Sequence, residues 1–145
     1  EAYEAGGAPA YQLYGLGLKH KHVPEIMEYG RVTRRPIFVP AVGNFDQGML
    51  VELPLHLDLL PGQPDAARLL DAYRAHYRGA EAVSVEDALE SGKLDAVALK
   101  GTNQLEIRVF GNPEARQALC VARLDNLGKG ASGAAVQNLK LMLGV

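Results

Sequence analysis

Residues 104–126 read QLEIRVFGNPEARQALCVARLDN and contain two clear strand signals. Apolar and polar side chains alternate in the first run, and every second residue of the other run is apolar, a period that is typical of strands with a buried face. The apolar positions are Leu105, Ile107 and Val109 in the first run and Ala118, Cys120, Ala122 and Leu124 in the second. Asn112 and Pro113 lie between the runs and favour a turn. The stretch therefore predicts an antiparallel hairpin.

A third strand is predicted over residues 49–59. Its odd positions are all apolar, whereas Glu52, His56 and Asp58 lie on the other face. Pro54 also lies on this outward face and has no N–H for a sheet hydrogen bond. This proline indicates an edge strand or a bulge.

Four further segments have helical composition, with a proline or capping residue near the start or a glycine near the end. They are the stretches Leu18 to Gly30 and Pro61 to Gly79, a brief turn from Glu86 to Glu90 capped by Ser84 or Asp87, and Gly128 to Val145. Helices and strands do not alternate strictly. The pattern predicts an α+β fold, an open and largely antiparallel sheet with helices on one face.

Length and composition limit the class of protein. A chain of 145 residues with 48% hydrophobic residues can bury one substantial core. Its 15 basic and 17 acidic residues provide no basic stripe for nucleic acid. No apolar run reaches the roughly 18 residues of a membrane span, and the single cysteine cannot form an internal disulfide. We expect a cytoplasmic protein that binds neither nucleic acid nor membrane.

The beginning of the chain differs in composition from the rest. Residues 1–18 predict a linker that leads into a short strand, because its glycines and Pro9 disfavour a helix. The domain is then expected over residues 19–145, with residues 128–145 as its last helix. Because the chain begins at Glu1 without a methionine and without a signal peptide, we expect it to be part of a longer protein.

His20 and His22 are the first candidates for chemistry. In an extended segment their spacing places both imidazoles on one side, where either could transfer protons or bind a metal. A metal would need further ligands, and neither His56 nor His76 has an acidic partner at ligand spacing. No metal site is expected, and spacing alone favours solvated loop histidines over a catalytic pair.

Cys120 is the one possible thiol nucleophile, and its position argues against that role. A reactive cysteine needs partial exposure and a positive environment that stabilises the thiolate. Cys120 instead lies on the inward side of a strand between Ala118 and Ala122. The pattern predicts a buried core cysteine.

Two turns could bind an anion. The segment LDNLGKGASG, residues 124–133, places several glycines before the last helix, where free N–H groups and the helix dipole favour phosphate. The segment lacks the Walker A spacing, and an ordinary glycine-rich cap is an equal alternative. The turn KGTN, from Lys100 to Asn103, could hold a carboxylate or phosphate, although an ordinary turn before a strand is slightly favoured.

Four segments together resemble the C-terminal part of the N-acetyl-gamma-glutamyl-phosphate reductases, and the resemblance extends from about residue 11 to residue 145. They are YGLGLKHKHVPEI (14–26), FVPAVGNFDQGMLVELPLHL (38–57), LKGTN (99–103) and LDNLGKGASGAAVQNLKLMLG (124–144). In this family a cysteine attacks the acyl phosphate, phosphate leaves, and a hydride from NADPH reduces the thioester. The resemblance implies an NADP-dependent enzyme that converts N-acetyl-5-glutamyl phosphate to N-acetylglutamate 5-semialdehyde in arginine biosynthesis.

The resemblance also implies roles for individual residues. It assigns the acid–base role to His22 and a substrate-contacting or orienting role to His20, and so reverses the interpretation from spacing alone. It implies that the last helix packs on a nucleotide-binding domain near the cofactor. The implied substrate-binding residues are Lys100, Asn103 and Arg35, and the implied cofactor-binding residues are Gly130, Ser132, Gly133 and Asn138.

Two departures limit what the resemblance implies. Gln47 precedes Gly48 where many family members carry an arginine, so Arg34, Arg35 or Lys100 would have to supply the cation. The family's dinucleotide loop is absent from this sequence, and Cys120 lies at a different point of the pattern from the family nucleophile. The chain is therefore expected to be a C-terminal catalytic and oligomerisation domain that is inactive alone.

Two alternatives stay open. A sister reductase that acts on carrier-linked aminoadipyl phosphate in lysine biosynthesis would differ in its substrate by one methylene. The chain could also be a dimeric binding module that has the same sheet but no catalytic activity. In each case an edge strand and an open sheet face predict a homo-oligomer formed through the sheet.

Overall fold

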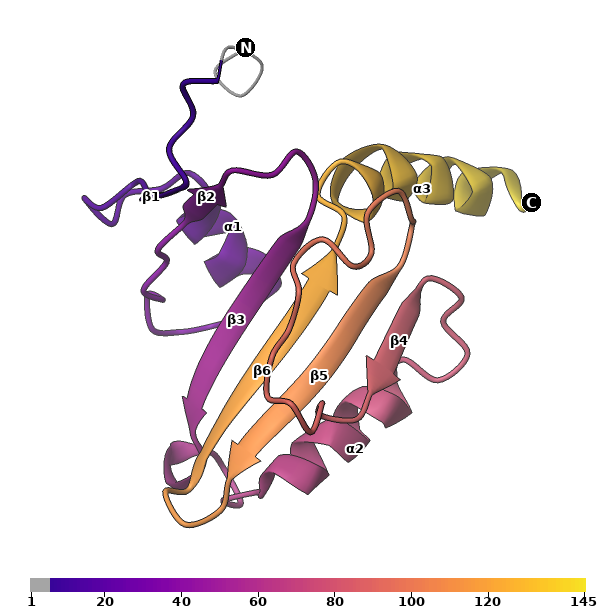
Figure 1. The fold of residues 1–145 in the computed structure, drawn as a ribbon. Coiled ribbons are helices and arrows are strands. Elements are labelled where there is room, and N and C mark those ends of the chain that lie inside the picture. Colours follow the sequence, from indigo (N-terminus) through magenta and orange to yellow (C-terminus); the bar gives the residue numbers. More distant parts are fainter. Residues whose placement is uncertain (1–5) are drawn as a thin grey trace. The chain divides into compact units, whose positions relative to one another are not determined.

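The structure is a computed structural model that describes residues 6–145. Contacts divide the chain into two compact units, one up to Asp46 and one from Gln47 onward. Figure 1 shows the elements of both units along the chain. The sequence-based boundary after residue 18 stays a prediction, and the contact boundary lies further along the chain.

A four-stranded sheet forms the centre of the second unit (Figure 1). Its order is β3 (Met49–His56), β6 (Gln117–Leu124), β5 (Leu105–Asn112) and β4 (Val83–Glu86). β6 is antiparallel to both of its neighbours, whereas β4 is parallel to β5. The predicted hairpin is confirmed as β5 and β6, and the predicted edge strand is confirmed as β3. Pro54 pairs in register with Leu119 without a bulge.

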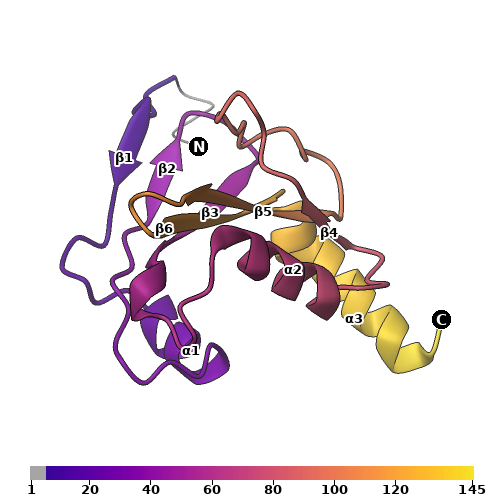
Figure 2. The same cartoon turned by 90° about the horizontal axis from the view of Figure 1, so that it is seen from below.

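One face of this sheet is covered by helix α2 (Ala66–His76). The buried cluster consists of Leu57, Val109, Ala118 and Cys120, and the stripe Ala66, Leu69, Leu70 and Tyr73 packs against it. α2 begins at Asp65, whose carboxylate accepts a hydrogen bond from the backbone N–H of Arg68 at 2.8 Å. Figure 2 shows α2 and the last helix, α3 (Gly133–Leu143), on the same side of the sheet. The predicted α+β architecture is confirmed.

Two local predictions are wrong. The strand predicted over residues 49–59 ends at His56, because its partner Gln117 is the first residue of β6, and Leu57–Leu59 form the 3₁₀ turn η1. The helical turn predicted after Ser84 is also absent. Val83–Glu86 pair with β5 instead, because parallel pairing satisfies the backbone groups that a local cap would have used.

The first unit contains a small two-stranded sheet and one short helix. β1 (Tyr11–Leu13) pairs antiparallel with β2 (Ala41–Gly43). Helix α1 (His22–Tyr29) has Pro24 in its first turn and Gly30 at its C-cap. The predicted short strand is confirmed as β1 and the predicted short helix as α1, which begins at His22 itself, whereas β2 was not predicted.

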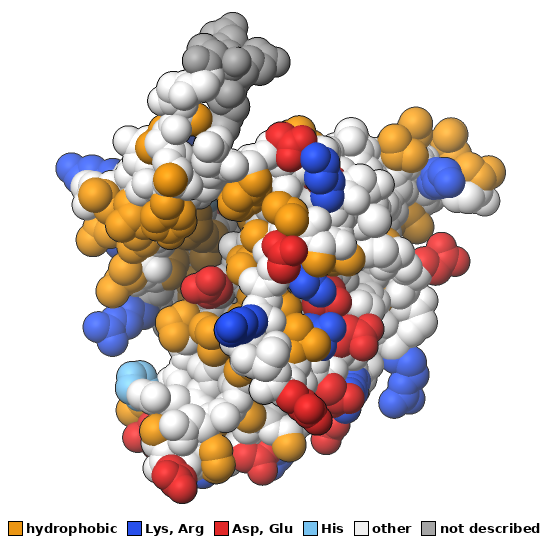
Figure 3. Space-filling view, in the orientation of Figure 1, with side chains coloured by type: hydrophobic (Ala, Val, Ile, Leu, Met, Phe, Trp, Pro, Cys, Tyr) orange, Lys and Arg blue, Asp and Glu red, His pale blue; other side chains and the backbone are white. Residues whose placement is uncertain are grey.

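The last helix makes few contacts within the second unit. A π-helical turn, η2 (Gly128–Ser132), runs directly into α3. Leu141 and Met142 are 73% and 83% exposed, and hydrophobic side chains gather near the end of α3 in Figure 3. The longest helices among the described residues have 11 residues and are too short to cross a membrane.

Candidate functional site

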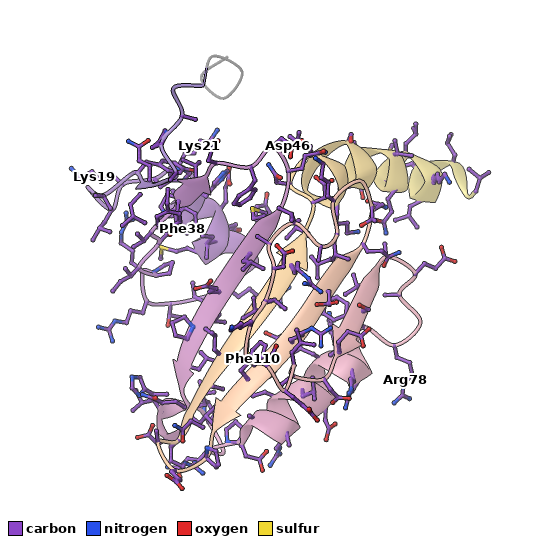
Figure 4. The ribbon with its side chains drawn as sticks, in the orientation of Figure 1. Lys19, Lys21, Phe38, Asp46, Arg78 and Phe110 are labelled. Carbon is purple, nitrogen blue, oxygen red and sulfur yellow. The ribbon has the colours of Figure 1, made fainter. Side chains whose placement is uncertain are left out.

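A cluster of aromatic rings surrounds the two histidines of the first unit. The ring centroids of His20 and His22 are 4.8 Å apart, and those of His20 and Phe38 are 5.1 Å apart. Tyr14 makes an edge contact with His20 at 5.7 Å. Phe38 is labelled beside α1 in Figure 4, together with Lys19 and Lys21, which flank His20 in the sequence. The structure therefore brings both predicted histidines into one cluster.

Hydrogen bonds give the two imidazoles different tautomers. The backbone N–H of His22 donates to Nδ1 of His20 at 3.3 Å, so the proton of a neutral His20 is on Nε2. Nδ1 of His22 lies 2.6 Å from Oε2 of Glu25 and donates to this carboxylate. Nε2 of His22 is then the basic nitrogen. These positions follow from the bonding partners, and they give His22 the arrangement of an oriented general base.

Glu25 was not predicted as a site residue. It lies three residues after His22, and this spacing places both side chains on one face of α1. The HVPE sequence at the start of α1 contained this signal. Both side chains are about half exposed, at 49% for His22 and 59% for Glu25, so solvent can reach the pair.

Arg35 supports the backbone that leads to the histidines. Its Nη2 donates to the carbonyl oxygen of Leu18 at 2.5 Å. Leu18 has a φ of 55°, which is an unfavourable left-handed conformation for leucine, and its N–H donates to Gly15. The guanidinium therefore stabilises a strained turn just before His20, whereas its predicted contact with substrate stays a prediction.

In the second unit, Asp125 connects several of the predicted site segments. Its carboxylate is fully buried directly after β6. Oδ2 accepts hydrogen bonds from the N–H of Gly101 at 2.6 Å and from Nε2 of Gln47 at 3.2 Å. Oδ1 accepts from the N–H groups of Leu127 and Gly128 at 2.8 and 3.0 Å. The hydrogen bonds from Gly101 and Gly128 hold the pKa of Asp125 below its usual range.

The two predicted anion-binding turns lie against each other. A Cβ on Gly128 would be 2.5 Å from the carbonyl oxygen of Thr102, and a Cβ on Gly133 would be 2.2 Å from Oδ1 of Asn103. Only glycine permits this approach. Asn103, Ser132 and Gly133 line one cavity of about 370 Å³, whose other lining residues are Glu81, Ala82, Val136, Gln137 and Lys140.

The backbone N–H groups at Gly130, Ser132 and Gly133 are not available as an anion cradle. The N–H groups of Gly130, Ser132 and Gly133 donate to carbonyl oxygens of residues 125, 127 and 128. A free helix start was expected from the sequence, but η2 precedes α3, and carbonyl oxygens of Asp125, Leu127 and Gly128 accept from these groups. Asn138 is exposed on α3 and does not line the cavity. The cofactor role of these four residues therefore stays a prediction.

Cys120 is confirmed as a core residue at 5% exposure. Burial raises the pKa of its thiol, and burial likewise raises the pKa of neighbouring Tyr73 to about 12. A thiol of raised pKa inside the α2 contact is a poor nucleophile. Within residues 6–145, no group of three or more His, Cys, Asp or Glu side chains is arranged to hold a metal ion.

Comparison with known proteins identifies the family. Residues 4–126 match the semialdehyde dehydrogenase dimerisation domain. The chain belongs to this family. It is 51% identical over 143 residues to N-acetyl-gamma-glutamyl-phosphate reductase 2 of Pseudomonas putida, a match covering 97% of this chain and 46% of that protein. It is 53% identical over 135 residues to the N-acetyl-gamma-glutamyl-phosphate reductase of Brucella ovis, covering 91% of this chain and 44% of that protein.

The chain thus spans slightly less than half the length of the curated relatives that it matches. The resemblance inferred from the four sequence segments is confirmed. Membership of a semialdehyde dehydrogenase dimerisation family also supports oligomerisation of the domain.

Proposed function

We propose that this chain is the acid–base and dimerisation domain of an NADP-dependent N-acetyl-gamma-glutamyl-phosphate reductase. The enzyme would convert N-acetyl-5-glutamyl phosphate to N-acetylglutamate 5-semialdehyde in the arginine pathway of the cytoplasm. The observation that carries the proposal is the oriented His22–Glu25 pair, in a chain 51% and 53% identical to two reductases of that name.

The reaction requires proton transfers that His22 is suited to perform. Nε2 of His22 would accept the proton of the cysteine nucleophile, so that the thiolate attacks the acyl carbon and phosphate leaves. Glu25 would stabilise the resulting imidazolium through Nδ1. After hydride reaches the thioester carbon, His22 would return the proton to the oxyanion of the tetrahedral intermediate. His20, with its proton on Nε2, would donate a hydrogen bond to substrate rather than act as a base.

Cys120 does not fit the role of nucleophile. It is the single cysteine of the chain and is enclosed by the core of the second unit. We therefore propose that residues outside these 145 supply the nucleophile, and that the isolated chain has no reductase activity.

NADPH, when bound, supplies the hydride. The Gly128–Gly133 turn does not fit a phosphate cradle, because the N–H groups of its three glycines and of Ser132 are already bonded within the chain. We propose that NADP is held mainly by residues outside this chain. Gly130, Ser132, Gly133 and Asn138 would form an adjoining surface, and the exposed apolar side of α3 would pack on the nucleotide-binding domain.

Substrate binding is proposed for Lys100 and Asn103, with Arg35 as a further cation. The acyl phosphate is an anion, and Lys100 lies close enough to Asp125 to lower the pKa of this carboxyl. Asn103 lines the cavity beside Gly133 and offers an amide for hydrogen bonding.

A full-length enzyme containing this chain would test the function in the oxidative direction. We expect NADP reduction that requires both N-acetylglutamate 5-semialdehyde and inorganic phosphate. A parallel assay with the carrier-linked aminoadipate semialdehyde separates the lysine-pathway reductase from the arginine-pathway enzyme. A folded oligomer without turnover on either aldehyde would instead support a non-catalytic binding module.

We further propose that a second copy of the chain covers the edge strand β3 of the four-stranded sheet. Val51 and Leu53 on β3 are 50% and 51% exposed, although they lie on the apolar side of the strand. Burying such side chains in a partner is favourable. Light scattering should give a mass of at least two chains, and a monomer at micromolar concentration would contradict this proposal.

A further inference from the structure

Three segments meet at Asp125, two of them distant from it in the sequence and one directly after it. They are the residues before β3 at Gln47, the turn before β5 at Gly101, and the residues before α3 at Leu127 and Gly128. Each segment leads directly into a regular element of the second unit. A single buried carboxylate thus sets the position of three chain segments relative to the end of β6.

All of the hydrogen-bonding capacity of this carboxylate is directed to these segments. A carboxylate offers about four acceptor sites, and Asp125 receives four donors. The bond from the Gly101 N–H is the shortest, at 2.6 Å. Asparagine has one amide oxygen and an NH₂ group that would face N–H donors, so it could not replace this pattern.

The neighbouring contacts reinforce the same arrangement. Oδ1 of Asn126 accepts from the N–H of Gly48 at 2.8 Å. Gly101 has a φ of 77°, so the turn at Lys100 is held in a left-handed conformation by its bond to Asp125. Gly128 lies against the carbonyl oxygen of Thr102 in the same turn. The Lys100–Asn103 turn is therefore held from two sides.

We propose that Asp125 is a positioning residue for the acyl-phosphate site, and that it sets the orientation of the Lys100–Asn103 turn toward the substrate. This inference rests on the proposed reductase function. Asp125 itself is fully buried and does not touch the substrate. It acts through the Gly101 N–H, which adjoins Lys100, and through the Gln47 amide at the start of β3.

Asp125→Asn in the full-length reductase tests this inference by the split between KM and kcat. We expect the KM for inorganic phosphate in the oxidative direction to rise by about tenfold or more, with kcat changed by less than about threefold. Glu106→Gln is the matched control, because Glu106 is also a buried carboxylate with several donors, but its partners are Arg108 and Arg123. The control should lower thermal stability and leave the KM for phosphate unchanged.

Gly101→Ala provides a second variant if Asp125→Asn does not fold. A Cβ at Gly101 meets nothing within 4 Å, so the substitution strains only the left-handed backbone of the turn. Its KM for phosphate should also rise severalfold. An unchanged KM in the folded variants of an active enzyme would overturn the inference. A wild-type enzyme without phosphate-dependent activity would instead remove the proposed function, and this inference with it.

Discussion

The two units contain the same kind of contact in opposite surroundings. In the first unit, Glu25 pairs with His22 at 2.6 Å, and both side chains are about half exposed. In the second unit, Glu106 pairs with Arg123 at 2.8 Å, and both side chains are only about one tenth exposed. Geometry is similar in the two pairs, whereas access to solvent differs about fivefold.

The buried pair belongs to a larger network on the sheet. Arg123 donates to both oxygens of Glu106, and Arg108 donates to one of them at 2.7 Å. The arginines also donate to the backbone carbonyls of Asp95 and Asp87, which fastens the segment between β4 and β5. Burial alone would raise the pKa of Glu106, but hydrogen bonds from Arg108 and Arg123 outweigh it and hold the pKa below its usual range.

The difference in solvent exposure implies different roles for the two ion pairs. An exposed ion pair contributes little to folding, and under the proposed function the His22–Glu25 contact would orient an accessible imidazole. Removing one partner of a buried pair leaves an uncompensated charge in the interior, so the Glu106 network serves the fold. Substitutions in the two pairs should therefore change different measurements.

The largest expected effect is on turnover. His22→Asn in the full-length reductase should lower kcat by roughly two to four orders of magnitude, the range for a lost general acid–base group. The thermal midpoint should change little, because His22 is exposed. Steady-state kinetics combined with thermal unfolding measures both quantities. A near-normal rate would move the acid–base role to His20 or elsewhere.

The next largest effect is on stability. Arg123→Met should lower the free energy of unfolding by about 3–5 kcal/mol, because it leaves the buried Glu106 with only part of its network. Denaturant unfolding measures this loss. Arg34→Met serves as a control at an exposed arginine and should change the value by less than about 0.5 kcal/mol. Equal values for the two variants would contradict a structural role for the buried network.

The same network predicts sensitivity to acid. The pKa of Glu106 is lowered in the folded state, so its stabilising contribution is present above the unfolded pKa of about 4.3 and is lost as pH falls through the lower folded value. Glu106→Gln should therefore flatten the decline of stability below about pH 4. Urea unfolding of both proteins between neutral and acid pH measures this difference, and parallel curves would exclude Glu106 as its source.

A smaller effect on turnover is expected in the first unit. Glu25→Gln keeps a hydrogen-bond acceptor near Nδ1 of His22 but removes the negative charge that stabilises the imidazolium. We expect kcat to fall by about 10–100-fold, as for other partners that orient a functional histidine. Glu28→Gln on the same helix is the matched control and should retain full activity. Equal activity of the two variants would show that Glu25 does not orient the base.

The smallest effect is expected at Cys120. In the full-length reductase, Cys120→Ala should retain full activity and lose only about 1 kcal/mol of stability, as for a small core substitution. In the folded protein the buried thiol should react with iodoacetamide far more slowly than in urea. Loss of activity in a stable Cys120→Ala protein would show that this thiol takes part in catalysis.

The parts of the fold that were predicted correctly depend on neighbouring residues in the sequence. Apolar side chains at every second position identified β5 and β6, and the missing N–H of Pro54 indicated that β3 is an edge strand or carries a bulge. The short strand β4 was missed because its partner β5 lies about 20 residues further along the chain. The capping residues Ser84 and Asp87 favoured a helical turn, but Val83–Glu86 instead pair in parallel with β5.

The candidate site shows the same division. The α+β class, the core position of Cys120 and the candidates His20 and His22 were all predictable from the sequence, because each depends on local pattern or on family motifs. The His22–Glu25 contact was readable from the spacing of three residues on one helix, whereas the joining of Gln47 and Gly101 to Asp125 was not. Those two residues lie 78 and 24 positions from Asp125, and a linear pattern does not show which hydrogen-bond donors meet which acceptors across such separations.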